Sequence, residues 1–375
     1  SYIRGERASP PPGLRRLAGG LSVPLPPAEP VSALRPRYAP NLHPRVLTPD
    51  RLPARRTFSL MGNGGCPYQA DARENPLYDG VELPAGTGRG CAFCTTGNDY
   101  VFRPAAEAAA DVLAQLRYVR SEAPALDLLV LKDQNPFGYL TEFLAAVARE
   151  RLEQALASAR VAGVTVAPYL VGIENFSQPE LDRMNKGTTA ALNEQFLDAL
   201  REWKDTYGPA LSLAHASFGF ILFTPWTTLD DLRTNLASIR RTRFDEFRGS
   251  LLASRARLYP DTAMFHLARR DGLLVDRFDS VEHDGARRYG YEEAAPWRFQ
   301  HPAVARLAEL GASLSAARGH RDQPALLQAL LDAFSSAIDP AQVGPEDVLA
   351  RLGVLHAPVA AAERAGAAAP SASAS

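Results

Sequence analysis

The chain has 375 residues, which is enough to bury a large core as one large domain or two smaller ones. Hydrophobic residues make up 46% of it and charged residues 22%, the composition of an ordinary soluble globular protein. A formal net charge of -1 gives no positive field for nucleic acid, and the longest apolar run, around Phe218 to Phe223, is too short for a membrane helix, so we expect no nucleic-acid and no membrane partner.

Residues 1–56 form a proline-rich leader with little hydrophobic periodicity. They contain 12 of the 30 prolines, including the runs Pro10-Pro11-Pro12 and Pro26-Pro27. Such a segment is expected to run extended over a surface or to be disordered. No charged and then apolar signal opens the chain, and its three cysteines make no disulfide framework, so the sequence predicts a cytoplasmic protein.

From Thr57 onwards, strand and helix signals alternate. The predicted strands are 57–61, 126–131, 164–173, 217–223 and 251–258, and the predicted helices begin at Pro104 or span 137–159, 189–207 and 228–240. Thr228, with Asp231 three residues later, predicts a capping box at the start of the last of these helices. The alternation predicts an α/β fold with a parallel sheet, as a partial (β/α)6 TIM-like barrel over residues 57–272.

The last third of the sequence is expected to be a helical C-terminal extension of this barrel. Its helical region spans residues 273–356, and the signals for it begin near Met264. The run from Leu326 to Phe334 is typical of a core-facing helix. Residues 357–375 are rich in alanine and serine and are expected to be disordered.

All three cysteines of the chain, Cys66, Cys91 and Cys94, lie in the segment 61–100. Two form a C-x-x-C turn, and the third lies between Gly-Gly and Pro, in a loop where a buried structural thiol is not expected. Thiolates in such glycine-rich loops usually bind metal. Three are one too few for a structural zinc, and the nearest histidine, His43, has no spacing relation to them. Three thiolates do suit a 4Fe-4S cluster with one iron open to another ligand.

Polar side chains follow each predicted strand where it ends. They are Lys132 to Pro136 after the second strand, Glu174 and Asn175 after the third with Lys186 further on, Thr224 to Thr228 after the fourth, and Tyr259 to Thr262 after the fifth. Loop polarity and helix capping would explain any one of these groups. Because the carboxyl ends of barrel strands meet at one rim, we interpret the whole set as a functional site.

The cysteine loop resembles that of the radical S-adenosylmethionine (SAM) enzymes, whose pattern is C-x-x-x-C-x-(aromatic)-C. GCPY around Cys66 and CAFC at residues 91–94 match it locally, with Phe93 at the aromatic position. Here 24 residues separate the first two cysteines, where the family usually has three. We interpret the difference as an insertion from roughly Gln69 to Gly90, the alternative being that Cys66 is not the first ligand.

The resemblance continues along residues 57–272. The segments GIENFSQPELDRMNKGTT, FGFILFTPWTTLDDLRTNL and RLYPDTAMFHLARRDG are similar to the core of cobalamin-associated radical SAM proteins. The opening SYIRGER resembles the end of the cobalamin-binding domain that precedes many such cores, with a chance match as the alternative. No D-x-H-x-x-G cobalamin-ligand motif occurs in the sequence.

The resemblance implies a role for each matching position. The cluster would be bound by Cys66, Cys91 and Cys94, and SAM by Phe93 beside the adenine, Asp133, Gln134 and Asn135 near the amino acid part, Glu174 and Asn175 near the ribose, and Thr224 near the adenine or the substrate. Relatives often have a second acid where this chain has Gln134. Lys186 would pair with Glu174 or with a substrate acid, or lie on the surface. His215 and His266 are expected to be core or rim residues, and no catalytic residue is assigned.

The implied activity is reductive cleavage of SAM, which starts radical chemistry on an unidentified small molecule or peptide. An external electron donor of the flavodoxin or ferredoxin type would supply the cluster, and cobalamin is a candidate cofactor for methyl transfer. Two alternatives remain open from the residues. One is a non-catalytic binding protein stabilised by zinc or a cluster on the same fold, and the other is an inactive relative that has lost the short cysteine spacing.

Overall fold

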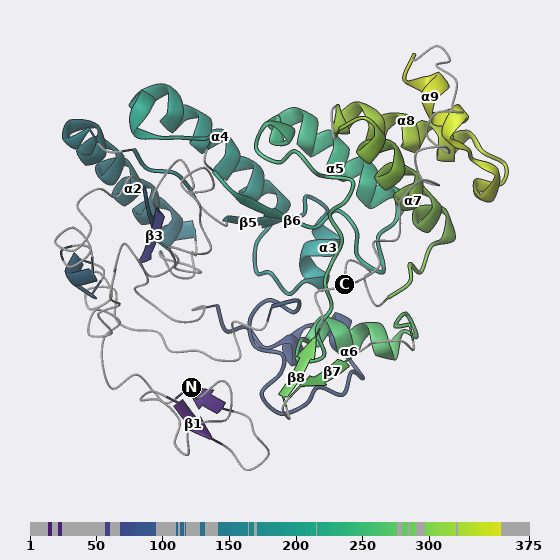
Figure 1. Ribbon diagram of the computed structural model, residues 1–375, viewed down its shortest axis with the longest axis horizontal. Coiled ribbons are helices and arrows are strands. Elements are labelled where there is room, and N and C mark those ends of the chain that lie inside the picture. The colour runs from purple at the N-terminus through teal and green to yellow at the C-terminus, as the bar shows by residue number, and fades with distance from the viewer. Residues whose placement is uncertain are drawn as a thin grey trace, which may run out of the picture. The chain divides into compact units, whose positions relative to one another are not determined.

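The computed structural model describes part of the chain and divides it into two compact units (Figure 1). The described residues are 14–16, 22–24, 57–60, 68–94, 110–111, 113–115, 117, 128–131, 142–163, 165–168, 171–214, 216–275, 280–283, 286–289, 297–319 and 322–353. Unit 1 consists of Ser1–Ala162, Tyr259–Ala263 and Arg277–Glu293. Unit 2 consists of Gly163–Leu258, Met264–Asp276 and Ala294–Ser375.

Unit 1 contains a parallel strand pair and two antiparallel ones. The parallel pair is β3 (Thr57–Leu60) with β4 (Leu128–Leu131), and the antiparallel pairs are β1 (Leu14–Arg16) with β2 (Ser22–Pro24) and β7 (Ser280–His283) with β8 (Ala286–Tyr289). Helix α2 (Glu142–Ala162) follows β4 along the chain. The strands predicted at 57–61 and 126–131 are confirmed, and they pair in the parallel direction that a crossover connection requires.

Unit 2 is built on the parallel pair β5 (Val171–Glu174) and β6 (Phe218–Phe220). Isolated parallel bridges join Val166 to Leu211 and Phe223 to Arg255. The helices from residue 178 onwards are α3 (Gln178–Arg183), α4 (Ala190–Tyr207), α5 (Leu229–Thr242), α6 (Ala263–Arg270), α7 (Pro302–Ala317), α8 (Gln323–Ser336) and α9 (Pro345–Arg351). The short 3-10 turns of this unit are η6 (Gly208–Ala210), η7 (Phe244–Glu246) and η8 (Pro340–Gln342), whereas η4 (Ala72–Glu74) and η5 (Pro76–Tyr78) lie in unit 1.

The described strands form two-stranded sheets rather than one continuous barrel sheet. The strand predicted at 251–258 is present only as the single bridge at Arg255. Of the one predicted at 164–173, the described residues show β5 and the bridge at Val166. The described fold is therefore a mixture of helices and strands with parallel pairs.

Two hairpins lie where none was predicted. The β7–β8 hairpin falls in the region that we expected to be mostly helical, and β1–β2 falls in the proline-rich leader. For β7–β8 the missed signal is the Asp284-Gly285 pair between its two strands, because Asp-Gly favours a two-residue hairpin turn. In the leader, Leu14–Arg16 pairs with Ser22–Pro24, although the proline content predicted an extended or disordered segment.

An aromatic cluster forms the core behind the β5–β6 pair. Phe176, Phe218, Phe220 and Phe244 are all buried, and their ring centroids lie between 5.0 and 6.1 Å apart in contacting pairs. Tilted and edge-on aromatic pairs at such distances add to the stabilisation that their burial gives. These rings fix the end of β5 against β6, and so position the residues that follow β5.

The helices of unit 2 pack in succession against one another. Helix α4 contacts α5, α5 contacts α8, and α8 contacts both α7 and α9, as the row of α5, α8 and α7 in Figure 1 illustrates. On α8, Leu326, Leu327, Leu330, Leu331 and Phe334 are all buried. The prediction of a core-facing helix at this run is confirmed.

Helix α5 begins with the capping box that the sequence predicted. The Asp231 backbone N–H donates to Thr228 Oγ1 at 3.1 Å, and the Thr228 backbone N–H donates to Asp231 Oδ2 at 2.8 Å. Two backbone donors that would otherwise lack partners at the helix start are thereby satisfied. This cap also fixes the turn that carries Thr224 into α5.

We predict that Thr228→Ala lowers the free energy of unfolding by about 1 kcal/mol, because it removes the N-cap oxygen. Thr234→Ala is the matched control, since Thr234 lies in the exposed interior of the same helix, where alanine is the better helix former. Urea unfolding followed by circular dichroism measures both. A loss in Thr228→Ala no larger than that in Thr234→Ala contradicts the assigned cap.

Candidate functional site

The described part of the cysteine loop holds Cys91 and Cys94 on one turn. Both thiols are partly exposed, and the Cys94 backbone N–H donates to the Cys91 carbonyl oxygen at 3.0 Å. Phe93, also partly exposed, lies between them in sequence. Two partly exposed thiols on a single turn are a donor set that suits a metal cluster at the protein surface.

The third predicted ligand, Cys66, lies outside the described residues. Within the described part of the chain, no three side chains of the metal-ligating types gather in one place. The three-thiolate site therefore stays a prediction. Asp133, Gln134, Asn135 and His215 also lie outside the described residues, so their predicted places remain predictions as well.

Glu174 ends β5 with an unusual backbone conformation. Its φ angle is +62°, in the left-handed region that residues other than glycine seldom adopt, and the strand register shifts between Gly172 and Glu174. Such a conformation costs about 1–3 kcal/mol and persists only where the surroundings enforce it. An enforced, strained acid at a strand end is a reason to propose a functional role.

The Glu174 carboxylate pairs with Lys186 and lies over two glycines. Lys186 Nζ is 3.4 Å from Glu174 Oε1, which is one of the partners that the sequence suggested for this lysine. A Cβ atom at Gly172 would lie 2.3 Å from Glu174 Oε1, and one at Gly219 would lie 3.1 Å from it. Because Gly172 on β5 and Gly219 on β6 have no side chains, the Glu174 carboxylate can occupy the space next to their backbone. Their signal in the sequence is a glycine inside each strand, which often marks a close approach.

Asn175 is fully buried and joins three segments of unit 2. Its Nδ2 donates to the Ile221 carbonyl oxygen at 2.7 Å, and its Oδ1 accepts from the Ser177 backbone N–H at 2.7 Å and from Asn235 Nδ2 at 2.9 Å. The side chain therefore ties the end of β5 to the segment after β6 and to α5. Its predicted contact with a ribose remains a prediction.

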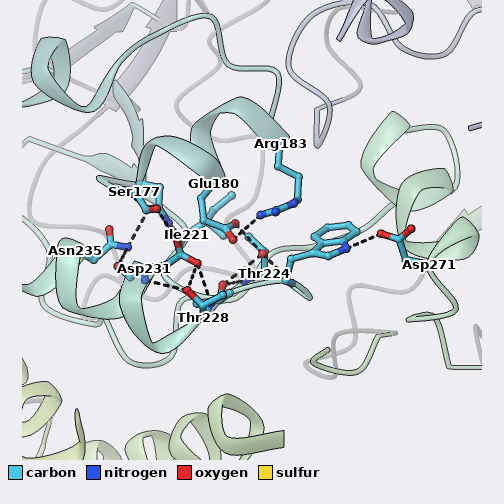
Figure 2. A network of polar contacts seen from close by, with 12 residues as sticks. Ser177, Glu180, Arg183, Ile221, Thr224, Thr228, Asp231, Asn235 and Asp271 are labelled. Atoms are coloured by element: carbon cyan, nitrogen blue, oxygen red, sulfur yellow. Dashed lines mark hydrogen bonds and ion pairs between the residues drawn. The ribbon is translucent and has the colours of Figure 1, made fainter. Parts of the chain in front are cut away.

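Thr224 belongs to a buried polar network that Figure 2 shows. Its Oγ1 donates to Glu180 Oε2 at 2.7 Å, and Arg183 Nη1 donates to Glu180 Oε1 at 2.7 Å. The Arg183 guanidinium lies over the Trp226 ring at 5.2 Å, and the Trp226 indole N–H donates to Asp271 Oδ2 at 2.7 Å. Thr224 and Glu180 are fully buried, so this network holds the turn after β6 against α3.

Glu180 is a site residue that the sequence analysis missed. Burial raises the pKa of its carboxyl from 4.5 to about 7, although the positive charge of Arg183 and the hydroxyl of Thr224 act in the opposite direction. Its signal in the sequence is a glutamate followed three residues later by an arginine, on the short helix directly after a polar strand end. The Glu180 carboxyl therefore gains or loses its proton in the neutral pH range.

His266 is buried on α6, as expected for a core residue. None of the helices in the described ranges is both long and apolar enough to cross a membrane.

No protein-family model and no curated protein matches the chain. The fold aligns with solved structures of the cobalamin-dependent S-adenosylmethionine radical enzyme OxsB. The apo, selenomethionine-labelled structure is 15% identical with a TM-score of 0.49, covering 81% of this chain and 51% of the other.

Two further structures of that enzyme align at similar levels. The one with aqua-cobalamin is 14% identical with a TM-score of 0.48 and covers 78% of this chain and 52% of the other. The one with aqua-cobalamin and S-adenosylmethionine is 14% identical with a TM-score of 0.44 and covers 79% and 45%. The chain thus spans about half the length of these structures. These scores are too low to show a family.

We predict a pH dependence of stability that Glu180 causes. Because the pKa of its carboxyl is raised in the folded state, the folded protein keeps a proton that the unfolded chain releases between pH 4.5 and about 7. Stability contributed by Glu180 therefore falls as pH rises through this window, by about 3 kcal/mol in total, and is constant above it.

Urea unfolding of the native sequence and of Glu180→Gln at pH 5, 6, 7 and 8 tests this. The free energy of unfolding of the native sequence should fall relative to that of the variant as pH rises, because glutamine cannot ionise. Asp205→Asn, at an exposed carboxyl of α4, is the control and should follow the native profile. Parallel pH profiles for the native sequence and Glu180→Gln contradict the raised pKa.

Proposed function

We propose that this protein is a radical SAM enzyme that holds a 4Fe-4S cluster on Cys66, Cys91 and Cys94. The observation that carries the proposal is the C-A-F-C turn, where the two described thiols are partly exposed on one turn around Phe93. A partial (β/α)6 barrel is our proposal for the core, and the parallel pairing of both β3–β4 and β5–β6 supports it.

The thiolates are proposed to bind the cluster and to leave one iron open for SAM. When bound and reduced, the cluster supplies the electron that breaks a carbon–sulfur bond of SAM, which yields methionine and a 5'-deoxyadenosyl radical. Asp133, Gln134 and Asn135 are proposed to bind the amino acid part of SAM, and Phe93 to pack beside the adenine. The role of the protein is to bind and orient SAM and the substrate and to exclude water.

Glu174 is the described residue best suited to the ribose. A carboxylate accepts hydrogen bonds from two neighbouring hydroxyl groups, and this one is held at a strand end above the glycine backbone of β5 and β6. Lys186 pairs with this carboxylate and balances its charge. Thr224 is proposed near the adenine or the substrate, with Glu180 fixing its hydroxyl.

The remaining partners are proposed from the resemblance of the sequence to radical SAM enzymes. We propose a flavodoxin or ferredoxin type of electron donor, an unidentified small molecule or peptide as substrate, and cobalamin as a candidate cofactor for methyl transfer. We propose the cytoplasm as the compartment, because a reducing environment keeps the thiols and the cluster intact.

We predict that anaerobically reconstituted protein contains iron and sulfide in 4Fe-4S proportions and forms 5'-deoxyadenosine from SAM with dithionite. Changing any of Cys66, Cys91 or Cys94 to Ala removes one thiolate ligand and should abolish both. Zinc bound without sulfide would favour the binding-protein alternative, and neither metal nor product would favour an inactive relative. A Cys66→Ala protein with a full cluster and normal product would refute the assignment of Cys66.

We predict that Glu174→Ala raises the Kd for SAM at least tenfold, because hydrogen bonds to a charged group contribute about 1.5–3 kcal/mol each. Equilibrium dialysis with reconstituted protein measures the affinity, and iron content confirms that the cluster is retained. Asp205→Asn serves as the control at an exposed carboxyl. Equal affinities for the native sequence and Glu174→Ala contradict the ribose assignment.

A further inference from the structure

Residues 71–89, here called the lobe, are closed at their base by backbone hydrogen bonds, here called the neck. The Ala72 N–H donates to the Gly88 carbonyl oxygen at 2.7 Å, and the Gly90 N–H donates to the Ala70 carbonyl oxygen at 2.9 Å. Between these bonds, Asp71 and Arg89 form an antiparallel bridge. The two ends of the lobe are therefore neighbours, although the lobe separates them in sequence.

The lobe is folded on its own residues. Arg73 Nη1 lies 3.1 Å from Asp71 Oδ1, and its Nη2 donates to the carbonyl oxygens of Leu83 and Pro84 at 3.4 and 3.3 Å. This arginine thus braces the start of the lobe against its far side. Two capped 3-10 turns, η4 and η5, lie between the start and the far side of the lobe, and Ala72 and Tyr78 on these turns are buried.

The neck shortens the path between the cysteines. Most of the 24 residues between Cys66 and Cys91 lie beyond the neck, and across it Ala70 is hydrogen-bonded to the residue that directly precedes Cys91. In sequence, Cys66 precedes Ala70 by only a few residues. Cys66 and Cys91 are therefore far apart along the chain but are connected by a short path through the Gly90–Ala70 hydrogen bond.

We propose that the neck is a positioning element for the cluster ligands. It holds the Cys91–Cys94 turn beside the chain that enters the lobe, so that cluster assembly depends on the neck and is independent of the length of the lobe. This inference rests on the proposed function for the identity of the ligands. The positioning residues are Ala70, Ala72, Gly88 and Gly90, which act through Cys91 and do not touch the cluster.

Gly88 is the neck residue that a single substitution tests most sharply. Its φ angle is +104°, and a Cβ atom there would lie 2.9 Å from Leu83 Cδ1. Gly86 is the matched control, because its φ angle is +82° and a Cβ atom there would meet no atom within 4 Å. Both alanine variants carry backbone strain because both φ angles are positive, but only Gly88 takes part in a neck hydrogen bond, so only Gly88→Ala places that strain in the neck.

A second variant removes the lobe and keeps the neck. Residues 73–87 are replaced by Asn-Gly, which connects Ala72 and Gly88 by a two-residue hairpin turn. Such a turn fits because these residues are opposite one another in an antiparallel pairing. The proposal predicts iron and sulfide loading equal to that of the native sequence in this hairpin variant and in Gly86→Ala, and at least a tenfold lower loading in Gly88→Ala.

Thiol cross-linking of the metal-free protein measures the distance between Cys66 and Cys91 without a cluster. In a Cys94→Ala background, a two-carbon bis-methanethiosulfonate should join Cys66 to Cys91, as mass spectrometry of tryptic peptides detects. The rate should be the same with the native lobe, with Gly86→Ala and with the hairpin, and at least tenfold lower with Gly88→Ala.

The two readouts separate failure of this inference from failure of the proposed function. No cross-link with the native lobe, or an undiminished rate in Gly88→Ala, overturns the neck proposal even if a cluster assembles. A cross-link without any cluster in the native sequence supports the neck and overturns the proposed function. If the hairpin variant does not fold by circular dichroism, the Gly88→Ala and Gly86→Ala pair decides the question.

Discussion

The amide group of Asn175 is the contact on which the described site depends. It hydrogen-bonds to Ile221 after β6, to Ser177 before α3 and to Asn235 on α5. The amide itself, Ser177 and Asn235 are buried. Leaving such groups without partners would cost about 1–3 kcal/mol each, so the segment after β5 has one arrangement. The left-handed backbone of Glu174 is adjacent to this anchor and is held by it.

Elements with strong local signals could be predicted from the sequence. Helix α5 was found from Thr228 and Asp231, and α8 from the spacing of its leucines, because caps and periodicity are encoded within a few residues. Strand pairing depends on partners far apart in the chain. Local patterns therefore do not show which strands pair. The strand predicted near Arg255 is a single bridge in the structure, and the described strands form two-stranded sheets.

The candidate site was predictable where a polar residue directly follows an apolar strand. Glu174 was selected in this way as a candidate, and its pairing with Lys186, one of the interpretations of that lysine, is present in the structure. Glu180 was missed because a glutamate on a short helix usually faces water, and its hydrogen bond from Thr224 joins residues that are distant in sequence. The folded lobe was missed for a similar reason, since its neck joins residues that its own sequence separates.

Three thiolates are proposed to hold a cluster with one iron open to SAM. Electron paramagnetic resonance of the reduced, reconstituted protein with and without SAM tests it most directly. We predict a 4Fe-4S signal whose g values and line shape change on addition of SAM, because the amino and carboxylate groups of SAM would bind the open iron. An identical cluster signal at saturating SAM, or no cluster signal at all, would contradict it.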